Sequence, residues 1–101
     1  MRVKMGGHEF EVRQPANMKD FGSCEITRCR NGSVRRIIRL RAKQGERAML
    51  DTALHEGLHA CHEEWPEELV RSTATDLARL LWTLGYRRVA DPFPSSRTGG
   101  S

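Results

Sequence analysis

The pentapeptide His55–His59, with the sequence HEGLH, limits how the residues around it can fold. Histidines four residues apart lie on one face of a helix, about 40° apart around its axis, so both imidazoles can reach one metal ion. Glu56 would lie beside them, where a carboxylate can accept a proton from a water molecule activated by the metal. The motif therefore predicts a helix that carries His55 and His59 as zinc ligands and Glu56 as the catalytic residue.

A catalytic zinc usually takes three protein ligands, so a third one is expected, and His62, Glu67 and Glu68 are the candidates. His62 would lie about 10 Å along the helix from His55, too far for one tetrahedral ion on a straight helix. It would line the cleft, or bind only if the helix end unwinds. With Leu77 marking the buried face of the next helix, Glu67 lies about 80° from that mark and Glu68 almost opposite. We therefore choose Glu67 as the third ligand.

Hydrophobic periodicity divides the chain into a strand-rich first half and a helical second half. At 101 residues it is expected to form one domain, residues 1–90, followed by a disordered tail at 91–101 that is rich in Pro, Ser and Gly. The predicted class is α+β: a small antiparallel sheet of about three strands, packed on the motif helix and on a second, antiparallel helix. The expected elements are strands at about 8–13, 24–30 and 33–42, and helices at about 46–63 and 66–84.

The second helix is expected to begin at Trp65-Pro66, because proline suits a helix N-terminus, and to be capped by Gly85. Its inner face is predicted from apolar spacing to consist of Val70, Thr73, Ala74, Leu77, Leu81 and Leu84.

Asn31-Gly32 favours a two-residue turn between the second and third strands. Counting back from such a turn pairs Glu25 with Ile38. Arg36 and Arg39 would then be near neighbours of Glu25.

The net charge of +4 is concentrated in this hairpin, which is rich in arginine. Such a patch could contact nucleic acid phosphates, or it could be a solvated sheet face with charges that protect its edges. Both interpretations remain open. The candidate nucleic-acid contacts are Arg28, Arg35, Arg36 and Arg39.

No apolar run approaches the roughly 20 residues of a membrane span, and residues 1–7 lack the apolar stretch of a signal peptide. We therefore expect a cytoplasmic protein with no membrane partner. Three cysteines without a CxxC pair are expected to be free thiols.

The segment from Leu54 to Arg88 resembles small phage- and prophage-type zincins of the gluzincin kind, and is remotely similar to SprT-like and ImmA/IrrE-like minimal zinc peptidases. The resemblance implies metallopeptidase chemistry, a protein or peptide substrate, host cytosol if the chain is phage-encoded, and the first glutamate of the second helix as third ligand. The chain departs from the SprT-like pattern because it has no later histidine ligand. The matching elements are His55 to Ala60, Glu67 to Val70, Ala74 to Arg79 and Leu81 to Arg87.

Three hypotheses follow from these patterns. The first is a zinc peptidase with Glu56 as general base. The second is a catalytically silent, zinc-stabilised phage module that binds a host protein or DNA through its arginine-rich hairpin. The third is a basic nucleic-acid-binding domain whose HExxH motif is incidental. The intact Glu56 favours the enzyme, because a purely structural metal site would not need it.

Overall fold

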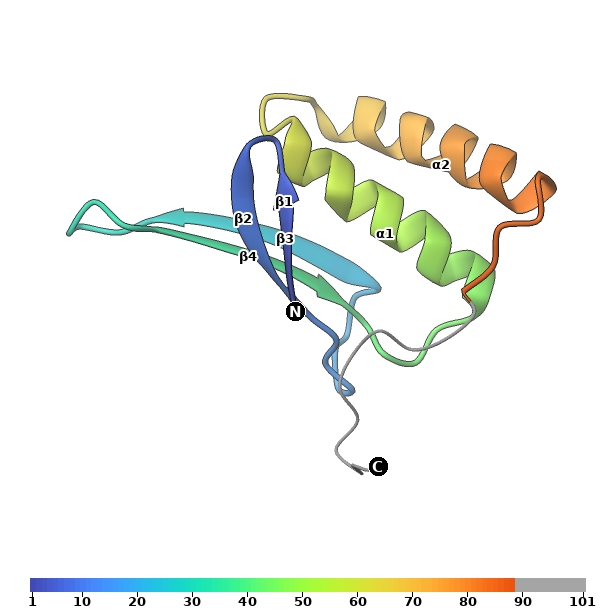
Figure 1. Cartoon of the computed structure of the whole chain (residues 1–101), viewed down its shortest axis with the longest axis horizontal. Coiled ribbons are helices and arrows are strands. Elements are labelled where there is room, and N and C mark those ends of the chain that lie inside the picture. The colour runs from blue at the N-terminus through green and yellow to red at the C-terminus, as the bar shows by residue number, and fades with distance from the viewer. Residues whose placement is uncertain (89–101) are drawn as a thin grey trace.

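The computed structural model describes residues 1–88 and has an α+β architecture, as expected (Figure 1). The tail predicted at 91–101 lies outside the described residues. Four strands precede two helices: β1 (Arg2–Met5), β2 (His8–Arg13), β3 (Gly22–Arg28), β4 (Val34–Leu40), α1 (Glu46–Cys61) and α2 (Glu67–Thr83).

The sheet has four strands in the order β1-β2-β4-β3, rather than the three antiparallel strands that were expected. The extra strand, β1, pairs antiparallel with β2 across a tight turn at Gly6 and Gly7, whose φ values of 58° and 83° suit glycine. The sheet is also mixed, because β4 inserts between β2 and β3 and runs parallel to β2. This order leaves β3 at one edge of the sheet.

The β3–β4 hairpin has a three-residue loop, Arg30 to Gly32, so the predicted two-residue turn is wrong. The amide of Cys29 donates to the carbonyl of Ser33, and Gly32 has a φ of 89° inside the loop. The extra loop residue shifts the register by one, so Glu25 lies opposite Ile37 and not Ile38.

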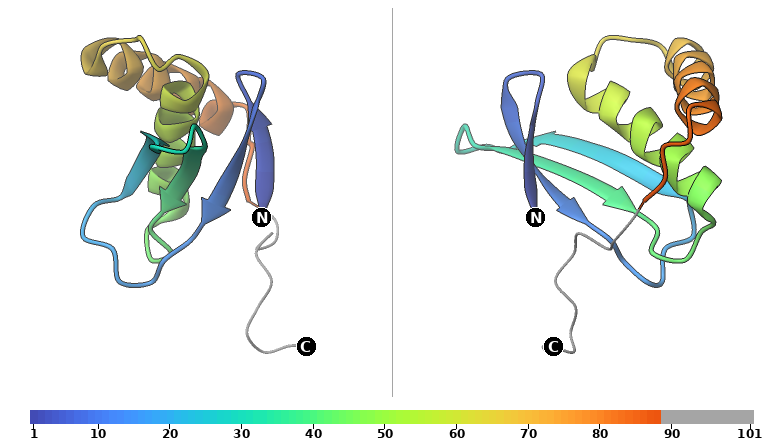
Figure 2. Two further views of the ribbon diagram at one scale, coloured as in Figure 1. Left: turned by 90° about the vertical axis from the view of Figure 1, so that its left-hand side faces the viewer. Right: turned by 45° about the vertical axis from the view of Figure 1, so that its right-hand side comes forward.

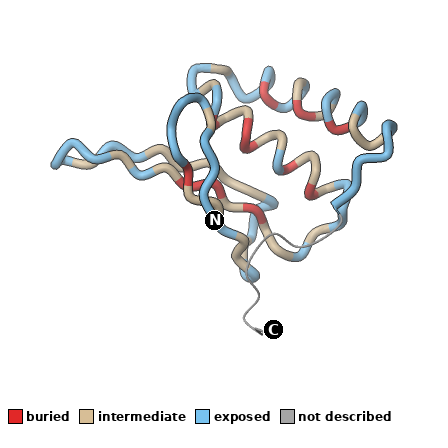
Figure 3. The backbone as a smooth tube through the Cα atoms, viewed as in Figure 1, coloured by how far each residue is buried: buried red, intermediate tan, exposed pale blue. Residues whose placement is uncertain are grey.

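One face of the sheet is covered by α1, and α2 packs on α1 (Figures 1 and 2). The small core lies between the sheet and α1, and the buried residues along the tube in Figure 3 concentrate there and along the inner side of α2. Within residues 1–88, no helix covers the other face of the sheet. The core cluster consists of Phe10, Ile38, Leu40, Met49 and Ala60.

The ends of α2 largely follow the predicted signals. Pro66 is its N-cap, and Gly85, with a φ of 93°, follows its C-terminus. The amides of Gly85 and Tyr86 donate to the carbonyls of Trp82 and Leu81, which is the Schellman arrangement.

The predicted inner face of α2 is wrong in part, because Leu77 and Leu84 are 37% and 64% exposed. The residues that are buried on this helix are Val70, Ala74 and Ala78. These small side chains face α1, so the helix is rotated towards Ala78, and the exposed leucines lie on an outer flank: Leu69, Leu77, Leu80 and Leu84.

Candidate metal centre

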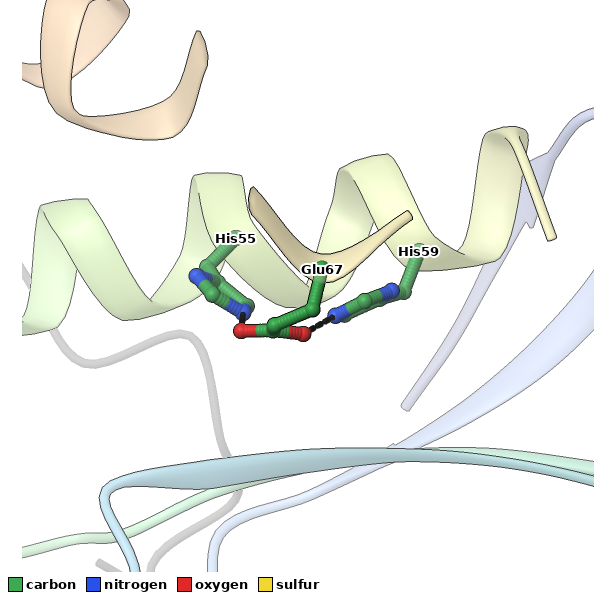
Figure 4. A group of neighbouring side chains, drawn as sticks. All are labelled: His55, His59 and Glu67. Carbon is green, nitrogen blue, oxygen red and sulfur yellow. Dashed lines mark hydrogen bonds and ion pairs between the residues drawn. The ribbon is translucent and has the colours of Figure 1, made fainter. Parts of the chain in front are cut away.

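Three side chains from the two helices converge at one point, as Figure 4 shows. Nε2 of His55 lies 3.0 Å from one carboxylate oxygen of Glu67, and Nε2 of His59 lies 2.9 Å from the other. The potential ligand atoms of the three residues all lie within 4.8 Å of one another. The structure thus brings together the three residues chosen as ligands.

The rotation of α2 explains how Glu67 reaches the histidines. In helical projection Glu67 lies within about 20° of both Ala74 and Ala78, at the centre of the face that packs on α1. Glu67 is therefore closer to the centre of the inner face than the 80° that was predicted with Leu77 as the reference. The connection at residues 62–66 reverses the chain, so the first turn of α2 returns beside the last turns of α1.

The two alternative ligands lie elsewhere. His62 is the C-cap of α1, and its ring stacks on Trp65 with the ring centroids 4.1 Å apart. Glu68 is exposed and lines a shallow surface hollow together with Arg71, Ser72 and other residues of α2. Neither residue belongs to the His55–His59–Glu67 group.

Glu56 is buried beside this group and is only 8% exposed. Burial, together with the negative charge of Glu67, raises the pKa of its carboxyl group to about 7. It lines two adjoining cavities, of about 460 and 590 Å³, that also share His55 and Glu67. A carboxyl group in this position can exchange a proton near neutral pH with a molecule in either cavity.

Gly22 is a site residue that the sequence did not reveal. A Cβ atom at this position would lie 2.5 Å from Cγ2 of Thr52 and 3.1 Å from Cγ of Glu56. The absence of a side chain therefore lets the start of β3 approach α1 closely, next to the buried carboxyl group. No local pattern in the sequence indicates this role, because the closeness of Gly22 to Thr52 depends on tertiary packing.

The smaller cavity lies between the candidate ligands and the edge strand β3. Gly22, Cys24 and Ile26 form its strand side, and Glu63 lies at the end of α1. Burial, with the nearby charges of Glu56 and Glu63, raises the pKa of Cys24 to about 11. Cys24 therefore remains a neutral thiol near pH 7. All three cysteines are free, as expected.

The larger cavity extends from His55 towards α2, where Arg71 forms part of its wall. A guanidinium nitrogen of Arg71 lies 3.3 Å from the Glu67 oxygen that faces His55. Within residues 1–88, Arg71 is the only arginine or lysine that lines either of the two cavities.

The four arginines considered for nucleic-acid contact do not share one face. Strand alternation places Arg35 and Arg39 on the outer face of the sheet, where both pair with Glu25. Arg39 is thus a neighbour of Glu25, as predicted. The second neighbour of Glu25 is Arg35 and not Arg36, so that part of the prediction is wrong. Arg36 and Arg28 lie on the face that α1 covers, and Arg28 pairs with Glu63. Hydrogen bonds from Thr27 and Arg39 lower the pKa of Glu25, so the outer pairs remain charged.

The donor set suits a divalent metal of the first transition series. Two imidazole nitrogens and a carboxylate are ordinary zinc ligands, and four ligands about 2.0–2.2 Å from a tetrahedral ion are separated by roughly 3.3–3.5 Å. One potential ligand atom from each of the three residues lies within 4.8 Å of the others, so adjustment of the side-chain torsions would bring the three atoms to these separations. The group can therefore hold a metal ion.

Comparison with protein-family models, with curated proteins and with solved structures finds no match for this chain. Within residues 1–88, no helix is both long and apolar enough to cross a membrane.

Proposed function

We propose that the chain is a zinc-dependent peptidase in which His55, His59 and Glu67 hold the metal and Glu56 is the general base. The observation that carries this proposal is the position of Glu56, buried in the wall of a cavity that all three candidate ligands also line. A metal site used only for stability is usually closed by four protein ligands. Here three ligands from the described residues meet beside an open cavity, which leaves room for water and a substrate.

A zinc ion held there supplies a Lewis acid that polarises a carbonyl group and lowers the pKa of a water molecule towards 7. Glu56 accepts a proton from the attacking water, whose oxygen forms a bond to the carbonyl carbon of the substrate. The same carboxyl group then donates that proton to the amine nitrogen as the carbon–nitrogen bond breaks. A pKa raised towards neutrality suits both transfers, because the group must gain and lose a proton at working pH.

The position of β3 supports an extended peptide as the substrate. One side of β3 is hydrogen-bonded to β4, and its other side is the edge of the sheet. The strand residues Gly22, Ser23, Cys24 and Ile26 also line the cavity beside the candidate metal centre. An extended peptide could add to this edge through backbone hydrogen bonds, which would place one of its carbonyl groups near the metal ligands.

Arg71 is our choice for the group that stabilises negative charge on the substrate carbonyl oxygen. His62, Arg71 and an arginine of the sheet are the candidates for this role. His62 is stacked on Trp65, whereas Arg71 lines the cavity shared by His55 and Glu56. Its pairing with Glu67 orients the guanidinium towards the centre, and a side chain that is 63% exposed keeps other N–H groups available.

The distribution of the arginines does not favour the DNA-binding alternative. Three of the four candidate contacts are paired with carboxylates, and the four are divided between two faces of the sheet. A phosphate backbone would therefore not meet them as one continuous positive surface.

Hydrolysis of a labelled casein or a mixed peptide library by the zinc-loaded protein tests the proposal. Glu56→Gln should lower hydrolysis by at least about 100-fold and leave metal content unchanged. Glu63→Gln is the matched control, because Glu63 lines the same cavity but lies outside the candidate ligand group and pairs with Arg28. Equal hydrolysis by wild type and Glu56→Gln would exclude Glu56 as the base. Metal binding without hydrolysis would instead support the catalytically silent module.

A further inference from the structure

The outer flank of α2 carries a row of exposed leucines that neither the core nor the metal centre uses. We call Leu69, Leu77, Leu80 and Leu84 the leucine row; they are 42%, 37%, 54% and 64% exposed. In helical projection the row covers about 80°, and its centre lies about 120° from Glu67. It therefore faces away from the metal centre, along the whole length of the helix.

The spacing within the row indicates a helical partner. Thr73, Leu77, Leu80 and Leu84 are separated by four, three and four residues, which is the repeat that packs one helix against another in a coiled coil. Exposed leucines are common singly, but a contiguous apolar strip of this kind marks an interaction surface.

We propose that the leucine row is the contact between two copies of this chain, with their α2 helices packed antiparallel about a two-fold axis near Ala78 and Arg79. This axis places Leu77 against the partner's Leu80. The same arrangement places Leu84 against the partner's Thr73, so every layer of the seam contains at least one leucine. A two-fold interface of this kind uses the same surface on both copies.

The charges beside the row favour this antiparallel arrangement. Asp76 and Arg79 lie on one flank and form an ion pair within the chain, with an N–O distance of 3.0 Å. In the antiparallel pair, Asp76 lies about 3 Å along the axis from the partner's Arg79, within reach of its long side chain. In a parallel two-fold pair, the flank that carries Asp76 and Arg79 would face the opposite flank of the partner, so these two residues could not pair across the seam.

The expected dimer is weak. A helix of 17 residues is about 25 Å long, so two such helices bury less than the roughly 800 Å² per partner of a standard interface. Tyr86, 62% exposed just beyond the helix, can add to the contact. We therefore expect a dissociation constant in the micromolar range, about −8 kcal/mol.

Sedimentation of the full chain between about 1 and 300 µM tests the association directly, since a micromolar equilibrium is half complete within this range. The mass should rise from the 11.5 kDa of one chain towards twice that value. Leu80→Glu should weaken the dimer at least about 30-fold, because it buries a charge at the centre of the seam. Ser33→Glu, which adds the same charge on the exposed β3–β4 hairpin and not on α2, should leave it unchanged.

Charge exchange provides a test that does not depend on changing a leucine. Asp76→Arg and Arg79→Asp should each be monomeric alone, because like charges then face each other across the two-fold axis. An equimolar mixture of the two variants should associate, because opposite charges then face each other across the seam. Neither variant contains the ion pair within its own chain, so that pair cannot explain the association. The proposal is overturned if the wild-type full chain stays monomeric up to the highest concentration, if Leu80→Glu still dimerises while folded, or if the mixed variants do not associate.

Discussion

Glu67, the first residue of α2, places one carboxylate oxygen 2.9 Å from Nε2 of His59, which lies eight residues earlier on α1. The other oxygen faces His55 at 3.0 Å. Each oxygen of one carboxylate thus contacts one histidine of the motif. The connection at 62–66 and the small inner residues of α2 together determine this contact, so the metal centre depends on how the two helices pack.

Replacing Glu67 should weaken metal binding far more than replacing its neighbour. Glu67→Ala removes one of three ligands, and we expect a loss of zinc affinity of at least about 100-fold, since even residues behind the ligands contribute 10–100-fold. Glu68→Ala is the matched control, because Glu68 lies outside the ligand group. Competition with a chromophoric chelator measures both affinities, and similar losses in the two variants would refute the assignment of Glu67.

The metal-free protein should lose stability as the pH rises, because of Glu56. Its pKa is about 7 in the folded chain, above the ordinary value of 4.5, so the folded state binds this proton more tightly than the unfolded state. The resulting stability is fully present below pH 4.5 and is lost as the pH rises through 7. The contribution is at most about 3 kcal/mol.

Urea unfolding in the presence of a chelator at several pH values measures this effect. Glu56→Gln has no carboxyl group to titrate, so its free energy of unfolding should fall less than that of wild type between pH 4.5 and 8. Parallel curves for the two proteins would show that Glu56 does not titrate as described.

Gly22→Ala should destabilise the fold and disturb the centre, because the new Cβ atom would lie 2.5 Å from Thr52 Cγ2 on a short, branched side chain. Overpacking of this kind costs about 1–3 kcal/mol and should displace α1 near Glu56. Gly57→Ala is the contrasting control, because its new contact is the flexible end of Met5 and alanine favours a helix. Thermal unfolding compares both variants with wild type. A Gly22→Ala protein as stable as wild type would show that β3 does not need this glycine.

Arg71→Gln should lower the turnover number by about 100-fold with little change in zinc affinity, if the guanidinium stabilises charge on the substrate oxygen. Arg79→Gln is the control, since Arg79 also lies on α2 but pairs with Asp76 away from the cavities. A parallel loss of zinc affinity and turnover in Arg71→Gln would mean that Arg71 acts only by holding Glu67 in position.

Local signals in the sequence were sufficient to place both helices and to select the three residues that converge as candidate ligands. The spacing of His55 and His59 depends only on helix geometry, and Pro66 and Gly85 mark helix ends through backbone chemistry that acts within a few residues. The direction in which each residue projects from the helix also separated Glu67 from Glu68, although Leu77, the reference for that projection, is partly exposed.

Features that depend on tertiary packing were not predictable in this way. Asn31-Gly32 suits several turn lengths, and the three-residue loop that forms shifts the hairpin register and moves Arg36 to the face beneath α1. The insertion of β4 beside β2 and the close approach of Gly22 to Thr52 join residues far apart in the chain. Leucine periodicity alone could not show that Ala78, rather than Leu77, faces α1.

Metal content is the most direct test of the centre itself. Elemental analysis of the purified full chain, after zinc addition and removal of the excess, should give about one zinc per chain. His59→Ala, which removes a ligand from the motif, should retain little or none. No bound zinc in the wild-type protein, or equal zinc in both proteins, would contradict a metal centre at His55, His59 and Glu67.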